Sequence, residues 1–87
     1  MIDFYKKKPV TIKAVQWTGD NFGEIEQIAR DCNPNCSIEF EDGHLRILTL
    51  EGTFGIGVGN WVIRGIKDEI YPCADDIFQA TYSLIEE

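Results

Sequence analysis

Three cysteines and one histidine are the residues whose types could bind a metal ion. Together they offer the four ligands of a Cys3His zinc site: Cys32, Cys36, His44 and Cys73. Structural zinc sites usually contain two closely spaced ligand pairs, and here only Cys32 and Cys36 are close in the sequence. The spacing therefore favours reduced thiols over zinc, and we expect neither a metal site nor a cofactor.

Covalent catalysis would need a base beside a thiol or hydroxyl, and His44 is the only imidazole in the chain. A single histidine beside a hairpin turn is more often a solvated side chain than a general base. Adjacent carboxylates occur at expected turns or at a helix start, where capping and solubility explain them: Glu41-Asp42, Asp68-Glu69 and Asp75-Asp76. We therefore expect no catalytic residues and no enzyme activity, and a minimal enzyme using His44 or Cys73 is the least favoured alternative.

Glycines alternate with apolar residues in the segment GTFGIGVG, residues 52–59. As a strand it has one face without side chains, formed by Gly55, Gly57 and Gly59. Such a strip can let a ligand or partner lie flat on the sheet, but glycines more often permit bulges, curvature or close approach of a helix. The segment is not a phosphate-binding loop, because it does not end in Gly-Lys-Ser/Thr and open a helix.

The elements that must position these residues are mostly short strands. Alternating polar and apolar residues predict strands at residues 9–17, 37–41, 44–51, 53–58, 61–64 and 69–71, with a hairpin turn at Asp42-Gly43. A helix is expected at residues 22–32, entered through Asn21, with a core stripe of Phe22, Ile25, Ile28, Ala29 and Cys32. A short helix is expected at residues 75–81. The predicted fold is α+β: a single small domain over residues 1–87, with a bent antiparallel sheet or partly open barrel of about five to seven strands.

Composition excludes several classes of protein. The chain has 87 residues, a net charge of −7 and 44% hydrophobic residues, which is enough apolar content for a core and argues against intrinsic disorder. An acidic surface disfavours nucleic-acid binding. No apolar run approaches the roughly 18–20 residues that span a bilayer, so no membrane partner is expected. An odd number of cysteines suits a reducing compartment, and we expect a soluble cytoplasmic protein.

Two blocks of the sequence resemble an uncharacterised family of short proteins of bacteriophages and prophages. They are the opening KKPVTIKAVQWTGDN and the closing GNWVIRGIKDEIYPCADDIFQATY, which together cover about half of the chain. Family members share a Lys-Pro-Val start, an Ala-Val-Gln-Trp strand, a Gly-Asp-Trp segment, Tyr-Pro-Cys and an Ile-Phe-x-x-Thr-Tyr ending. This sequence has Asn60 where Asp is usual and Asp68 where Gly is usual. Because both residue types tolerate turns, we expect the backbone to be retained.

The resemblance implies a phage or prophage gene product acting in the host bacterial cytoplasm. On the matching positions, polar Gln16 between apolar strand residues is the first choice for a shared surface, with Trp17, Trp61 and Tyr71. The leading hypothesis is a non-enzymatic protein-binding accessory module that engages a host or phage protein, or a second copy of itself. The alternative is a small-ligand protein that binds or sequesters a nucleotide-type molecule on the glycine strip. The candidate binding residues are Gln16, Trp17, Gly55, Gly57, Gly59, Trp61 and Tyr71.

Overall fold

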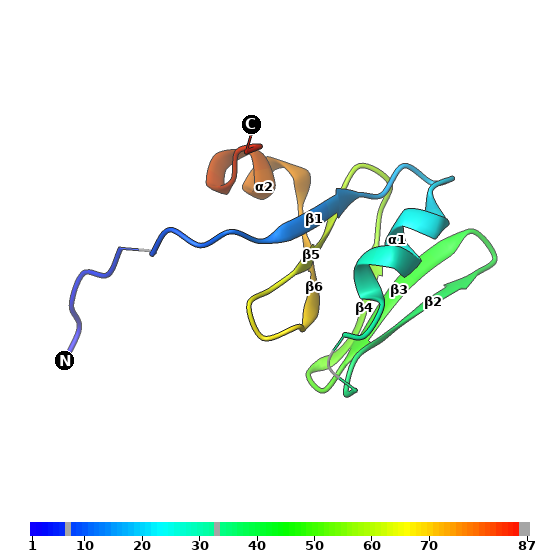
Figure 1. Ribbon diagram of the computed structural model, residues 1–87, viewed down its shortest axis with the longest axis horizontal. Helices are drawn as coiled ribbons and strands as arrows, with labels where there is room; N and C mark the ends of the chain where they lie inside the picture. The colour runs from blue at the N-terminus through cyan, green and yellow to red at the C-terminus, as the bar shows by residue number, and fades with distance from the viewer. Residues whose placement is uncertain (7, 33, 86–87) are drawn as a thin grey trace.

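The computed structural model describes residues 1–6, 8–32 and 34–85, and this part of the chain forms six strands and two helices (Figure 1). In chain order they are β1 (Lys13–Gln16), α1 (Phe22–Ala29), β2 (Ser37–Glu41), β3 (His44–Thr49), β4 (Gly52–Ile56), β5 (Trp61–Arg64), β6 (Ile70–Cys73) and α2 (Asp75–Thr81). The α+β class and the antiparallel strands are confirmed. The second helix has the bounds that the sequence predicts.

The strands form two separate antiparallel sheets of three strands each. One, which we call the terminal sheet, has the order β1-β5-β6, and the other, the meander sheet, has the order β2-β3-β4. This differs from the single bent sheet or partly open barrel that the sequence predicts, because neither sheet closes and they share no paired strand. Gly59 explains the division. Its φ of +96° turns the chain after β4, so that β5 pairs with β1 and not with β4.

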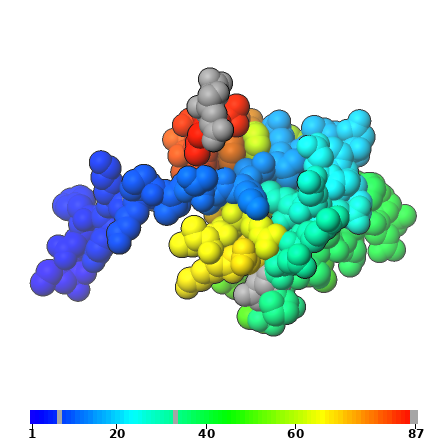
Figure 2. All heavy atoms as spheres, in the orientation of Figure 1, coloured from blue at the N-terminus to red at the C-terminus, as the bar shows by residue number. Residues whose placement is uncertain are grey.

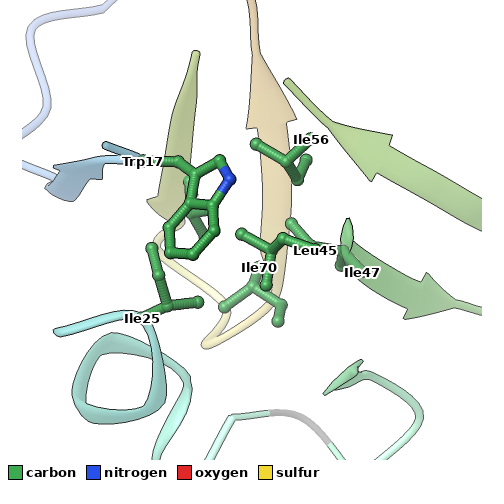
Figure 3. Packing of buried hydrophobic residues seen from close by; sticks show 7 residues of the cluster. Trp17, Ile25, Leu45, Ile47, Ile56 and Ile70 are labelled. Carbon is green, nitrogen blue, oxygen red and sulfur yellow. The ribbon is translucent and has the colours of Figure 1, made fainter. Parts of the chain in front are cut away.

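The apolar core fills the space between the two sheets and α1 (Figure 3). Pairing partners share a face, so Val15 and Val62 point inward from the terminal sheet, while Leu45 and Ile56 point inward from the meander sheet. The fully buried members of this cluster are Trp17, Ile25, Leu45, Ile47, Ile56, Val62 and Ile70. The predicted apolar stripe is confirmed within α1, since Ile25 is buried and Phe22, Ile28 and Ala29 pack against the cluster. Cys32, its last predicted member, also packs against the cluster but lies beyond the end of the helix.

Helix α1 ends at Ala29, three residues earlier than predicted, because Arg30 is extended and Asp31 has a φ of +57°. The backbone carbonyls at the end of α1 have no helical N–H donors, and the side chain of Arg64 on β5 supplies donors in their place. Its guanidinium donates hydrogen bonds to the backbone oxygens of Ile28, Arg30 and Asp31, the last at 2.9 Å. A cation at the C-terminus of a helix satisfies unpaired carbonyls and also suits the helix dipole.

The entry to α1 also differs in detail from the prediction. Asn21 is the N-cap residue, but its side chain makes no capping hydrogen bond to the helix backbone. Its Oδ1 instead accepts from the backbone N–H of Thr18 at 2.9 Å, and its Nδ2 donates to the backbone oxygen of Gln16 at 2.8 Å. The asparagine therefore closes the turn between β1 and α1.

Helix α2 covers the face of the terminal sheet that points away from the core. Trp61 and Phe78 stack with ring centroids 3.8 Å apart and an interplanar angle of 6°. The backbone N–H of Asp75 donates to Oδ1 of Asn60 at 3.1 Å, so Asn60 holds the start of the helix. Asp68 has a φ of +60°, which agrees with the expectation that it tolerates a turn conformation.

The N-terminal arm, residues 1–12, is described at residues 1–6 and 8–12, and these extend away from the body of the molecule before β1 begins (Figures 1 and 2). The apolar side chains near its start are almost fully exposed, with Ile2 at 99%, Phe4 at 105% and Tyr5 at 89%. The predicted first strand, residues 9–17, is therefore shortened to four residues, because only these pair with β5.

Candidate functional site

Four of the seven candidate binding residues lie together where β1 meets β5. Gln16 pairs with Trp61 in the sheet register, and Gln16 Nε2 donates to the backbone oxygen of Gly59 at 2.9 Å. Gly59 in turn donates its N–H to the backbone oxygen of Trp17 at 2.7 Å. Trp17 is only 1% exposed, so its ring belongs to the core and presents no surface to a partner. In this group the polar side chain of Gln16 holds the loop that precedes β5.

The other two residues of the glycine strip, Gly55 and Gly57, lie elsewhere, on the outer face of the meander sheet. Gly55 pairs with Arg46, which points away from the core. No described atom lies within 4 Å of a Cβ built on Gly55, so close approach of a helix does not explain this glycine. A Cβ on Gly57 would lie 3.3 Å from Nδ2 of Asn60. The strip is thus an open surface, bordered by a shallow hollow of about 350 Å³ lined by His44, Leu45, Arg46, Gly55, Ile56 and Gly57.

The seventh candidate, Tyr71 on β6, lies in a third place, on the wall of a groove. This groove has a volume of about 510 Å³ and is lined by Asn35, Cys36, Thr49, Leu50, Glu51, Phe54, Glu69, Ile70, Tyr71 and Pro72. Strands β4 and β6, which both border it, are the outermost strands of their sheets. We call it the edge groove. The sequence does not place Tyr71 beside the meander sheet, because the two sheets meet only in the folded chain.

One polar atom in the wall of the edge groove is buried without a partner. Oε2 of Glu69 makes no hydrogen bond within the described residues. The side chain of Glu69 lies over Gly65, where an added Cβ would collide with its Oε1 and lie 3.1 Å from a ring carbon of Tyr71. A buried carboxylate oxygen without a donor is costly, so a rearrangement of the groove wall that brings a donor to it would be favoured.

Sequence reasoning missed Glu69 because Asp68-Glu69 reads as an ordinary acidic turn. Only its place directly before β6, closing the turn that begins at Gly65, hints that its side chain lies against the sheet. The side chain of Tyr71 is partly buried. Burial, a hydrogen bond with Tyr82 and the nearby charge of Glu69 raise the pKa of Tyr71 to about 12.

The residues considered for zinc do not gather in one place. Within residues 1–6, 8–32 and 34–85, no three His, Cys, Asp or Glu side chains form a group that could hold a metal ion. Cys32 and Cys36 are neighbours, whereas His44 begins β3 and Cys73 ends β6. In this same part of the chain, both helices are too short to cross a membrane.

No family model, curated protein or solved structure matches this chain.

Proposed function

We propose that this protein is a non-enzymatic binding module whose edge groove receives an extended protein segment. The proposal rests on one observation: Oε2 of Glu69 is buried without a hydrogen-bond partner among the described residues, in the wall of an otherwise largely apolar groove. A segment that fits has a cationic side chain among apolar ones, because the cation would supply the missing donor and the apolar side chains would cover Phe54 and Ile70.

The occupant we favour is the N-terminal arm of a second copy. The arm has this chemistry, with Ile2, Phe4 and Tyr5 exposed beside lysines. Charge complementarity supports it as well. Residues 1–12 carry three lysines and one aspartate, whereas residues 13–87 carry five basic and fourteen acidic side chains. The opposite charges of arm and body favour contact between the arm of one copy and the body of another.

Strand edges add a second route for binding. A segment in the edge groove lies next to β4 and β6, whose outer edges offer unpaired backbone groups, so it could add a strand to either sheet. Pro72 suits an edge position, but it removes one backbone N–H from β6, so strand addition is favoured at β4. The phage or prophage origin that the sequence resemblance implies suits a small accessory module of this kind.

Sedimentation of the full-length protein over a range of concentrations tests this proposal. We expect a concentration-dependent dimer or higher assembly that weakens with salt and is lost in a Phe4→Ser/Tyr5→Ser variant. Glu69→Gln should weaken association on the order of tenfold or more, because the arm cation loses its buried charge partner. Ile66→Ser removes another exposed apolar side chain, which is 71% exposed and does not line the groove, and serves as the matched control.

A full-length protein that stays monomeric at all concentrations overturns self-association through the arm. A labelled peptide of residues 1–12 separates the remaining outcomes. If it fails to bind the full-length protein by fluorescence anisotropy, the edge groove is not the receptor for the arm. If it binds equally well to wild type and Glu69→Gln, the arm docks at another surface.

A small-ligand function has one observation in its favour, the open glycine strip beside Arg46. A phosphate-bearing molecule could contact this arginine, although Glu39 already forms an ion pair with it at 2.9 Å. A thermal-shift screen with nucleotides checks this alternative. A ligand at 100 times its Kd stabilises by roughly 2.7 kcal/mol, so no shift at millimolar nucleotide would exclude it.

A further inference from the structure

Two cysteine sulfur atoms lie side by side where the chain passes from α1 to β2. Sγ of Cys36 donates a hydrogen bond to Sγ of Cys32 at 2.9 Å. Sγ of Cys32 donates in turn to the backbone oxygen of Cys36 at 3.4 Å. Since sulfur atoms in a disulfide are about 2.05 Å apart, a covalent bond needs an approach of only roughly 0.9 Å.

The two thiols lie in a different environment from that of an exposed cysteine. Both side chains pack against the apolar core and are partly buried. Burial, assisted by the neighbouring Cys36, raises the pKa of Cys32 to about 11, and the guanidinium of Arg64 opposes this only in part. Cys32 therefore remains a thiol near neutral pH, whereas Cys36 lines the edge groove, where a small disulfide can reach it.

We propose that Cys32 and Cys36 are a modification site that forms a reversible intramolecular disulfide by exchange with a low-molecular-weight disulfide. In the first step the thiolate of Cys36 attacks one sulfur of the small disulfide, whose S–S bond breaks and releases one small thiolate. In the second step Cys32 loses its proton to solvent and attacks the Cys36 sulfur, which releases the second small thiolate. Two protein thiols are thus oxidised, and the small disulfide is reduced to two thiols.

The disulfide would also constrain the edge groove, because Cys36 lines that groove. A disulfide would fix the Cys36 end of the groove wall to the end of α1. This consequence rests on the proposed function, whereas formation of the disulfide does not, so the two can fail separately.

The test uses the full-length protein in mixtures of oxidised and reduced glutathione, trapped with an alkylating reagent and analysed by intact mass and peptide mapping. We expect loss of two alkylatable thiols through a Cys32–Cys36 cross-link, while Cys73 remains alkylated. Ring closure should be faster at alkaline pH than at neutral pH, because Cys32 must lose its proton before it attacks.

Serine variants identify the order of the steps. Cys36 in Cys32→Ser should accumulate as a mixed disulfide with glutathione, whereas Cys36→Ser should form no intramolecular cross-link. Cys73→Ser is the matched control and should form the cross-link as the wild type does. Equal modification of all three cysteines without a Cys32–Cys36 cross-link, or a cross-link that involves Cys73, would overturn the proposal.

Discussion

Trp61 donates its indole N–H to the carboxylate of Asp75 at 2.8 Å, while its ring stacks on Phe78 one turn further along α2. The two contacts hold the helix at two points on the outer face of the terminal sheet. A seven-residue helix has little stability of its own, so tertiary anchors of this kind determine whether it forms.

Replacing Trp61 by Phe should destabilise the protein in a pH-dependent way. Hydrogen bonds from Trp61 and then Gln79 hold the pKa of Asp75 below its usual value of 3.8. A lowered pKa in the folded state stabilises above the usual value, and this contribution is lost as pH falls through the folded pKa. We therefore expect urea unfolding to show a wild-type advantage at pH 7 that shrinks below about pH 4.

The variant Asp75→Asn separates the pH-dependent contribution of the Asp75 carboxylate from the loss of stacking between Trp61 and Phe78. In that background, Trp61→Phe should cost a similar amount at every pH. A wild-type advantage over Trp61→Phe that is constant from neutral to acidic pH would contradict the assigned role of the carboxylate.

Two glycine substitutions should have very different effects on stability. Gly59→Ala forces an alanine to adopt a φ of +96° and should cost roughly 1–3 kcal/mol. Gly55→Ala has open space around the new methyl group and should change stability by no more than about 0.5 kcal/mol. Equal losses for both variants in chemical denaturation would show that the glycine strip is constrained in a way that the backbone does not explain.

Arg64→Met should destabilise α1 by leaving its last carbonyls without donors. The Arg64 side chain is only 15% exposed, and hydrogen bonds from a charged group of this kind contribute roughly 2–3 kcal/mol. Arg64→Lys should recover little, because an ammonium cannot reproduce the planar fork. Arg46→Met is the control, since its exposed ion pair with Glu39 contributes only about 0.2–1 kcal/mol. A loss of helix content measured by circular dichroism should accompany the Arg64 variants alone.

Ile47→Ala should cost about 2–5 kcal/mol, because the side chain is fully buried between the sheets and its removal leaves a cavity. Ile66→Ala, at an exposed position, should change stability by no more than about 0.5 kcal/mol. Guanidinium unfolding of both variants checks this core assignment. Similar midpoints for the two would be inconsistent with a core centred on the contact between β3 and β6.

The sequence could predict what local periodicity determines. The stripe on α1, the hairpin turn at Asp42-Gly43 and the bounds of α2 are all set by residues a few positions apart. The turn has φ values of +53° and +78°, which Asp and Gly tolerate.

Relationships between distant segments could not be predicted in this way. Periodicity does not say that β5 pairs with β1, so it could not divide the strands into two sheets. The end of α1 depends on Arg64, a residue 34 positions beyond Arg30, whose carbonyl it binds. The edge groove combines β4, β6 and the chain before β2, and its carboxylate at Glu69 therefore had no local signal.

The division of the strands into two sheets also leads us to expect an order in which the parts of the chain fold. The meander sheet joins neighbouring strands through short turns, whereas the terminal sheet must bring Ala14 to Ile63 across the whole meander. Because closing a long loop costs entropy before its contacts are gained, the meander can form early and β1 docks late. Trp17 directly follows β1, so we expect its indole to become buried only when β1 docks, after the meander sheet has formed.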